Sequence, residues 1–287
     1  MLTRRQAALF LTGASLFPQK PEPAEAPVDF ICPMDPDVRA KGPGKCPRCG
    51  MKLEAGIADY VEYPVRVVPA PKVIIPGAAT TLRIEVLHPK TGVRVRDFLE
   101  VHEKLFHLFV ISEDLQSFAH EHPIPSADGT FSLTYNFPKS GGYRLLADFF
   151  PKGGTPQLVT RSLYAKGKFE QTKPIVADMA PQQGVNMQVE LVTEPAQPLA
   201  GKKTLLFFRL KPHEGLEPFL GAWGHLLAAS PDLIDLIHGH PAFAEPGPQI
   251  QFNVIFPRPG VHRVWVQFQR QGELNTLAFS VPVTALM

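Results

Sequence analysis

The chain has 287 residues, which is enough for two domains of ordinary size with short appendages. Its 44% hydrophobic and 20% charged residues are typical of a folded soluble protein, and its 31 prolines and 22 glycines predict many turns. The formal net charge of +2 gives no electrostatic basis for binding nucleic acid or a membrane. We therefore expect no nucleic-acid partner, and no membrane contact beyond the N-terminal segment.

The N-terminal segment has the pattern of an export signal. Arg4 and Arg5 precede an uncharged run from Ala7 to Phe17, which is too short for a membrane span of about 18 or more apolar residues. The paired arginines indicate a twin-arginine signal, and an ordinary Sec signal that contains two arginines is the alternative. We interpret residues 1–26 as export signal and linker, and we expect a bacterial periplasmic or otherwise exported protein.

All three cysteines lie between residues 29 and 53. Clustered thiols in odd number argue against a disulfide framework and favour metal binding, or one local disulfide. A Pro-Arg turn brings two thiolates three residues apart towards one ion, and a third sulfur comes from the preceding arm. Sulfur ligands favour Cu(I), whereas three thiolates with a carboxylate suit Zn(II), so we expect copper or zinc. The candidate ligands are Cys32, Met34, Asp35, Cys46, Cys49 and Met51.

The stretch FICPMDPDVRAKGPGKCPRCGMKL resembles a known family over about 24 residues. It is similar to the small heavy-metal-binding domain that precedes bacterial periplasmic copper and silver efflux adaptors and some copper-transporting ATPases. The resemblance implies metal binding by residues 29–53, and a periplasmic efflux or metal-transfer protein as partner. The family commonly has His where this chain has Asp35, so that ligand role would pass to Asp35, a methionine or water. A purely structural metal, or a Cys46–Cys49 disulfide, is the alternative.

After residue 58 the sequence changes to short alternating runs that Pro and Gly interrupt every 8–12 residues or so, a pattern typical of β-sheet proteins. The runs in the first half predict strands at 65–68, 81–87, 106–111, 130–137, 143–149 and 159–165. Those in the second half predict strands at 187–193, 204–210, 225–229, 249–256, 262–269 and 274–283.

The two series of strands are copies of each other. FHLFVISEDLQSFAHEHP from Phe106 recurs as GHLLAASPDLIDLIHGHP from Gly224, with eight identical residues spaced by 118 positions. A repeat of this length is a whole domain. We therefore predict an all-β protein with two tandem immunoglobulin-like or cupredoxin-like sandwich domains, at 58–168 and 172–287, preceded by the small Cys/Met segment.

Histidines recur within the repeats in a pattern that can bind metal. On a strand, the two imidazoles of a His-x-His pair face the same side, about 6.6 to 6.8 Å apart along the backbone. A further histidine begins the preceding apolar strand, so each repeat could form a three-histidine site suited to Cu(II) or Zn(II). Hydrogen bonding that holds the Ser-x-Asp-Leu loop is the alternative role. The secondary candidate ligands are His102, His107, His120, His122, His225, His238 and His240.

These patterns together predict an exported heavy-metal-binding protein that acts in sequestration, delivery or resistance. The chain lacks a nucleophile elbow, a phosphate loop and a dinucleotide fingerprint, so we predict a binding protein and no enzyme. An envelope adaptor with a structural metal, or a copper or zinc enzyme at the histidines, are the alternatives. We expect Asp148 and Arg144 to be outward charges of an alternating strand.

Overall fold

The computed structural model describes residues 29–31, 38–47, 50–56, 61–168, 173–243 and 247–286. The chain divides into two compact units, Met1–Asp59 and Tyr60–Met287. The predicted signal and linker, residues 1–26, lie outside the described residues. Within the described ranges, no helix combines the length and hydrophobicity needed to cross a membrane.

The first unit contains a small antiparallel sheet. Its strands β1 (Asp29–Ile31), β2 (Arg39–Ala40) and β3 (Glu54–Gly56) pair in the order β2-β1-β3. Cys46 and Leu53 are buried against three partly buried side chains, those of Phe30, Val38 and Ala40. This segment therefore has a small apolar core of its own.

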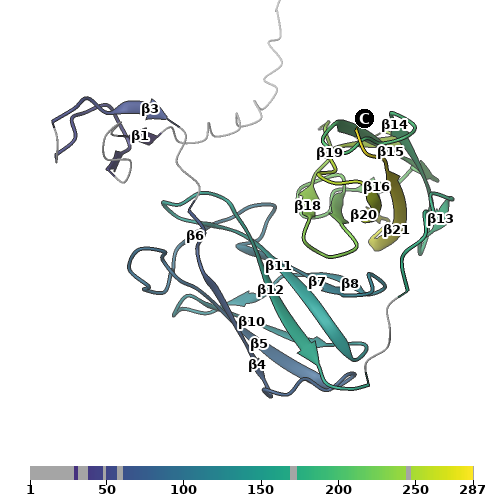
Figure 1. Cartoon of the computed structure of the whole chain (residues 1–287), viewed down its shortest axis with the longest axis horizontal. Helices are drawn as coiled ribbons and strands as arrows, with labels where there is room; N and C mark the ends of the chain where they lie inside the picture. Colours follow the sequence, from purple (N-terminus) through teal and green to yellow (C-terminus); the bar gives the residue numbers. More distant parts are fainter. Residues whose placement is uncertain are drawn as a thin grey trace, which may run out of the picture. The chain divides into compact units, whose positions relative to one another are not determined.

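The first repeat is a sandwich of two antiparallel sheets, coloured blue to teal in Figure 1. One sheet has the order β4-β5-β10-β9, with strands Val65–Ala70, Ala79–Val86, Thr130–Asn136 and Ile124–Pro125. The other has the order β12-β11-β7-β8, with strands Gln157–Ala165, Gly141–Pro151, Phe106–Ser112 and Phe118–Glu121, and β6 (Phe98–Leu99) pairs with β11. Alternate residues of both sheets fill one core of aromatic and branched side chains, as sandwich packing requires.

The second repeat has the corresponding two sheets. One has the order β13-β14-β15-β19, with strands Gln182–Gln183, Gln188–Glu194, Lys203–Lys211 and Gln249–Ile255. The other has the order β16-β20-β17-β18, with strands Leu216–Glu217, Gly260–Arg270, His225–Ala229 and Leu236–Gly239, and β21 (Glu273–Val283) pairs with β20. A second apolar core lies between these sheets.

The prediction of two tandem all-β sandwiches is confirmed. Each of the twelve predicted strands is present, and its ends lie within two residues of the prediction. The prediction missed short strands such as β8 and β18, because runs of two to four residues are too short to show alternation.

Strands β7 and β17 are buried along their whole length. On β7, Leu108 and Val110 face the core of their own repeat, whereas Phe109 and Ile111 belong to a separate apolar cluster. That cluster joins residues of both repeats and consists of Phe109, Ile111, Leu115, Leu146, Leu227, Ala229, Leu233 and Trp265. The outer faces of β7 and β17 therefore pack the two repeats together.

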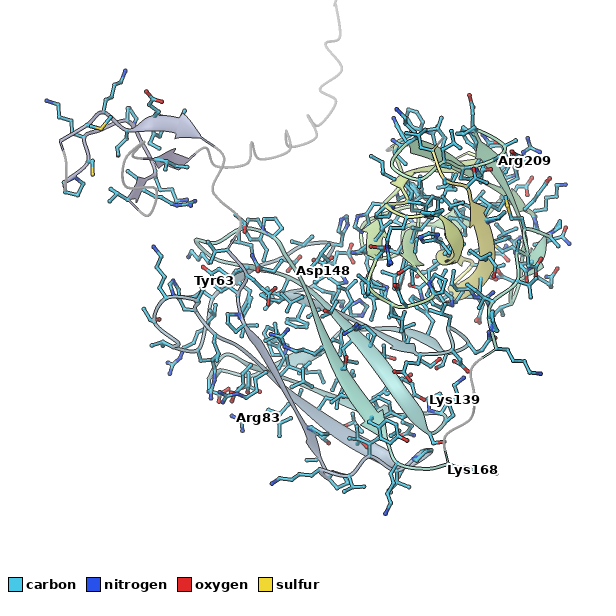
Figure 2. All side chains as sticks on the ribbon, viewed as in Figure 1. Tyr63, Arg83, Lys139, Asp148, Lys168 and Arg209 are labelled. Atoms are coloured by element: carbon cyan, nitrogen blue, oxygen red, sulfur yellow. The ribbon has the colours of Figure 1, made fainter. Side chains whose placement is uncertain are left out.

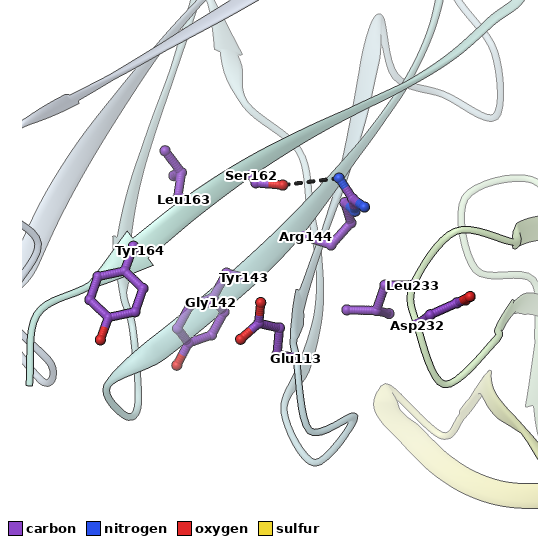
Figure 3. A pocket seen from close by; sticks show the side chains of 9 residues that line it. All are labelled: Glu113, Gly142, Tyr143, Arg144, Ser162, Leu163, Tyr164, Asp232 and Leu233. Carbon is purple, nitrogen blue, oxygen red and sulfur yellow. Dashed lines mark hydrogen bonds between the residues drawn. The ribbon is translucent and has the colours of Figure 1, made fainter. Parts of the chain in front are cut away.

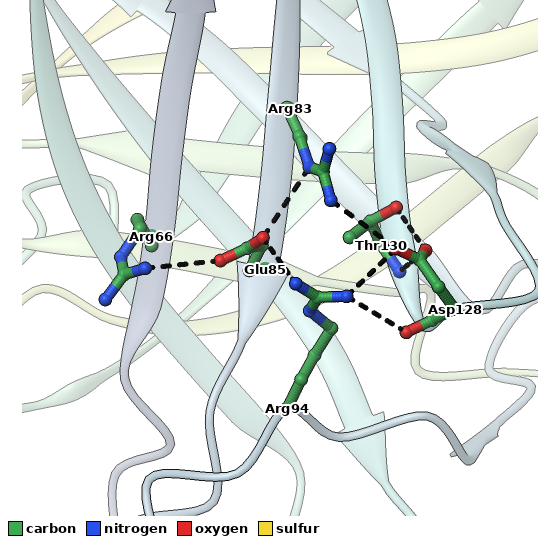
Figure 4. A network of polar contacts seen from close by, with 6 residues as sticks. All are labelled: Arg66, Arg83, Glu85, Arg94, Asp128 and Thr130. Carbon is green, nitrogen blue, oxygen red and sulfur yellow. Dashed lines mark hydrogen bonds and ion pairs between the residues drawn. The ribbon is translucent and has the colours of Figure 1, made fainter.

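A charged network covers part of the β4-β5-β10 face of the first repeat (Figure 4). Arg94 contacts Glu85 at 2.8 Å and Asp128 at 2.9 Å, which links β5 to the turn before β10. Arg66 and Arg83 add longer ion pairs to the same carboxylates. Cross-strand pairs of this kind stabilise a sheet face that is open to water.

A pocket of 340 Å³ lies where β11 and β12 meet a loop of the second repeat (Figure 3). Arg144 donates a hydrogen bond to Ser162 Oγ at 2.9 Å in its wall, and Asp232 and Leu233 come from the second repeat. None of the seven candidate histidines lines this pocket.

Candidate metal centre

Each repeat brings its three recurring histidines together. His107 lies on β7, His120 on β8, and His122 follows β8 directly. In the second repeat His225 lies on β17, His238 on β18, and His240 follows β18. Within each trio, one nitrogen of every ring lies within 4.8 Å of the others. We call these sets the first trio and the second trio.

The strand pairing explains why the trios form. β8 runs antiparallel to β7 with His120 opposite Phe109, so the ring of His120 stacks on Phe109 at a centroid distance of 4.3 Å. Because side chains alternate across a strand, His122 faces the same side as His120, and their rings are 4.7 Å apart. The corresponding rings of His238 and His240 are 4.5 Å apart.

The hydrogen bonds of the first trio fix where its protons lie. His107 Nε2 contacts the carbonyl oxygen of Val101 at 2.9 Å, and because that oxygen only accepts, His107 must donate from Nε2. His120 Nδ1 donates to Gln267 Oε1 at 2.8 Å, and the Gln267 amide is oriented by its own donation to Thr276.

In neutral rings, His107 Nδ1 and His120 Nε2 are then both lone pairs, yet they lie only 3.0 Å apart. Two such lone pairs repel each other unless a cation lies between them. Nitrogens bound to one tetrahedral ion at 2.0–2.1 Å would be about 3.3 Å apart, close to the spacing found here.

The second trio repeats this design. His225 Nε2 donates to the carbonyl oxygen of Phe219 at 2.8 Å, and His238 Nδ1 donates to Asp148 Oδ2 at 2.6 Å. Three of the remaining nitrogens, His225 Nδ1, His238 Nε2 and His240 Nε2, are buried and have no hydrogen-bond partner among the described residues. Buried polar atoms are rarely left unpaired, so three of them directed at one place indicate a ligand.

Burial keeps most of these imidazoles neutral. Desolvation lowers the pKa of His120 and of His240 to about 2, that of His225 to about 3, and that of His122 to about 4. It also lowers the pKa of His107. The neutral ring is the form that binds a metal ion, so these candidate ligands could bind one at neutral pH without losing a proton.

His102 is also part of this region, but beside the trio of the other repeat. We predicted it as an additional ligand near His107. Its ring instead stacks on His240 at a centroid distance of 3.7 Å and lies 5.6 Å from His225. The backbone at His102 has a φ of 48°, and Leu220 at the same position of the second repeat has 50°. The equivalent turns thus place one extra imidazole on the second trio alone.

The sequence missed two partners of the trios, Asp148 and Gln267. They occupy matching places, since Asp148 pairs with His107 across β11 and β7, and Gln267 pairs with His225 across β20 and β17. Each reaches a histidine of the opposite repeat. The expectation that Asp148 (labelled in Figure 2) is merely an outward charge is wrong, because its carboxylate accepts from His238.

The Ser-x-Asp-Leu loops are held by their own side chains. Ser112 Oγ donates to Asp114 Oδ1 at 2.6 Å and accepts from Ser117 N–H at 2.9 Å, and the second repeat has the same pair of contacts at Ser230. His107 and His225 do bond to backbone carbonyls, but those belong to a different turn. Backbone hydrogen bonding, the alternative role of the histidines, therefore accounts for only one ring nitrogen in each trio.

The thiol segment is described only in part. Cys32, Met34, Asp35 and Cys49 lie outside the described residues. Cys46 is buried, its N–H donates to the carbonyl of Met51 at 2.8 Å, and its own carbonyl accepts from Gly50 at 2.9 Å. Cys46 and Met51 thus sit at the base of a tight hairpin turn, and the Met51 side chain is 40% exposed.

Two protein families match the chain. The family described as heavy metal binding domain matches residues 30–55, so this segment is a metal-binding domain. The family described as domain of unknown function (DUF8832) matches twice, at residues 61–166 and 182–285, which confirms the tandem repeat. No curated protein matches the sequence.

Several solved structures resemble the chain weakly. The Escherichia coli adhesin FdeC is 13% identical with a TM-score of 0.28, and the match covers 82% of this chain and 71% of FdeC. A Ca²⁺-stabilised ice-binding adhesin of an Antarctic bacterium is 7% identical with a TM-score of 0.25, covering 79% of this chain and 50% of the adhesin. Fibronectin(III)-like modules of Clostridium thermocellum CbhA are 12% identical with a TM-score of 0.21, covering 77% of this chain and 94% of the modules.

These likenesses are too low to bear on function.

The two matches of the DUF8832 family together span more than half of the sequence. The chain therefore belongs to the DUF8832 family, with two copies of its domain and a heavy metal binding domain before them in the sequence.

Proposed function

We propose that this protein is an exported heavy-metal-binding protein that sequesters or delivers copper or zinc. The observation that carries the proposal is the second trio, where three buried imidazole nitrogens converge without a hydrogen-bond partner in the described structure. Nitrogen donors of this kind suit Cu(II) and Zn(II). Export rests on the basic and apolar N-terminal sequence.

The two kinds of site suit different metal ions. The thiol segment offers the sulfur ligands Cys32, Cys46, Cys49 and Met51, which favour Cu(I), whereas the trios offer only imidazole. Release to a periplasmic efflux or metal-transfer protein would proceed by ligand exchange, with the partner's sulfurs displacing a methionine or Asp35 before the thiolates.

We infer binding and not catalysis, because the trios lie against packed strands. The 340 Å³ pocket is lined by residues other than the trios. The proposal thus assigns the trios to storage or delivery of the ion itself.

Metal content per chain tests the proposal. Reduced full-length protein is loaded with Cu(I), Cu(II) or Zn(II), dialysed and analysed by mass spectrometry. The same measurement is made on a variant that lacks residues 29–53 and on a variant that carries both His107→Asn and His225→Asn. We expect the deletion to lose Cu(I) and keep Cu(II) or Zn(II). The double substitution should keep Cu(I) and, when combined with the deletion, abolish the remaining Cu(II) or Zn(II) binding. Absence of bound metal in the deletion variant would contradict a role for the trios.

A further inference from the structure

The outer partners of the two trios are exchanged between the repeats. Asp148 of the first repeat accepts from His238 of the second trio at 2.6 Å, and Gln267 of the second repeat accepts from His120 of the first trio at 2.8 Å. The His120 ring lies 5.5 Å from His225, and the His107 ring lies 6.3 Å from His238. Neither trio is thus independent of the other repeat.

We propose that the two trios form one paired centre for two Cu(II) or Zn(II) ions, with a tight site at the second trio and a weaker, exchangeable site at the first. This inference rests on the proposed function. It states in addition which trio binds the first ion and which residues determine the order of binding.

The first reason for the inequality is the chemistry of the outer partners. A carboxylate that accepts the proton of a metal-binding imidazole orients the ring and raises its basicity, and losing such a partner typically costs 10- to 100-fold in affinity. Asp148 supplies this carboxylate to the second trio. Gln267, at the matching place, supplies only a neutral amide oxygen to the first.

The second reason is His102. Its ring covers His240 at 3.7 Å, whereas the equivalent residue in the second repeat is Leu220. An imidazole at this place adds a nitrogen-bearing ring against His240 and near His225. Leu220 provides no imidazole, so the first trio lacks this additional nitrogen.

The third reason is repulsion between the two ions. Rings of opposite trios approach to 5.5 Å between His120 and His225 and to 6.3 Å between His107 and His238, and His107 and His225 are buried. Charges at such separations interact strongly where water is excluded. An ion in the second trio therefore weakens the binding of the next ion at the first trio.

Cu(II) titration of a thiol-free full chain tests the inequality. Cys32, Cys46 and Cys49 are replaced by Ser so that the thiol segment neither binds nor reduces the ion, and binding is followed by chelator competition and electron paramagnetic resonance. We expect two ions per chain with dissociation constants at least tenfold apart, and a spectrum broadened by dipolar coupling when both are bound. His240→Asn should remove the tighter ion, and His122→Asn the weaker one.

Reciprocal substitutions of the outer partners test the cause. Asp148→Asn should weaken the tighter site about tenfold or more and leave the weaker one within about twofold. Gln267→Glu should strengthen the weaker site, and His102→Leu should weaken the tighter one without unfolding the turn, since Leu220 adopts the same φ. Melting curves of each metal-free variant identify any loss of folding.

The outcomes separate the two proposals. Two ions of equal affinity, or an Asp148→Asn effect confined to the first trio, would overturn the inequality and leave the metal-binding function standing. Failure of the thiol-free chain to bind any Cu(II) or Zn(II) would overturn both the inequality and the part of the proposed function that assigns metal ions to the trios.

Discussion

The proton on each histidine ring decides what the trios can bind. Carbonyl oxygens of Val101 and Phe219 accept from one nitrogen of His107 and His225, and this leaves the other nitrogen as a lone pair that faces the trio. Burial then keeps these two rings neutral, because it lowers the pKa of both. The positions, tautomers and neutral charge of these two rings therefore all favour metal binding.

A residue outside the trios gives a prediction about pH. His262 is 1% exposed, and burial lowers its pKa below the ordinary 6.5. Below about pH 6.5 the unfolded chain takes up a proton that the folded chain resists, so the metal-free protein should lose stability as the pH falls. His262→Tyr, the residue that repeat one has at this position, should reduce the loss by up to about 1.4 kcal/mol per pH unit.

Urea unfolding at a series of pH values, in the presence of a chelator, measures this slope. At pH 8 an ordinary histidine carries no extra proton in the folded or the unfolded chain. A difference in unfolding free energy between the two proteins at that pH therefore reports packing alone. An unchanged slope between pH 6.5 and 5 in the His262→Tyr protein would contradict the prediction.

The thiol segment gives a second prediction for single residues. Cys32→Ser should lower the affinity for Cu(I) at least tenfold, because the three thiolates are expected to bind one ion together. Competition with a Cu(I) chelator measures the affinity, and Met51→Leu serves as a comparison that removes only a weaker thioether. Full affinity in the Cys32→Ser protein would show that the cysteines do not share an ion.

At the level of elements, strands β7 and β17 carry the centre because they are buried on both faces. One face fills the core of its own sandwich, and the other joins the cluster between the repeats and presents a histidine at its first or second position. The flanking β8 and β18 then bring the His-x-His pairs alongside. The trios are therefore fixed by the regular pairing of a sheet.

The charged network on the opposite sheet of repeat one makes a prediction about stability. Arg94→Met should lower the free energy of unfolding by about 1 kcal/mol, since Arg94 is 31% exposed and joins two carboxylates at short range. Arg66→Met should cost less, because Arg66 is 63% exposed and makes one contact at 3.4 Å. Urea unfolding at 0.05 M and 1 M NaCl measures both, and salt should reduce the difference. Equal effects of the two substitutions would be at odds with this account.

Gly129 gives a prediction for the turn before β10. Its φ is +83°, and an added Cβ would lie 2.5 Å from the carbonyl oxygen of Val95. Gly129→Ala should therefore destabilise the protein by about 1–3 kcal/mol, from backbone strain and the clash together. Gly92→Ala offers a comparison with a positive φ but an open surrounding, so thermal unfolding should show a smaller loss there. A larger loss for Gly92→Ala would refute the clash as the cause.

For the whole molecule, the exchanged partners connect metal binding to the packing of the two repeats. Because Asp148 and Gln267 each hold a histidine of the opposite repeat, we expect an ion in either trio to stabilise the contact between repeats. Zn(II) at 100 times its dissociation constant should add about 2.7 kcal/mol of stability per site. Calorimetry should show one transition for the tandem repeat that moves up with Zn(II). Two separate transitions, with only one of them shifted, would contradict the coupling.

The sequence predicted much of the fold and the membership of the trios. Alternating runs located the long strands, and the recurrence of His107, His120 and His122 as His225, His238 and His240 identified the histidines that the structure brings together. It did not predict that the repeats pack through β7 and β17, because a fully apolar strand does not reveal what covers its second face. The roles of Asp148 and Gln267 depend on that packing, so no local pattern could show them.

The most direct test of the central claim is anomalous diffraction at the metal edge from crystals of the protein grown with Zn(II) or Cu(II). The account predicts two peaks, one within bonding distance of His107, His120 and His122 and one within bonding distance of His225, His238 and His240. Metal bound only at the thiol segment, with ordered and metal-free trios, would contradict it.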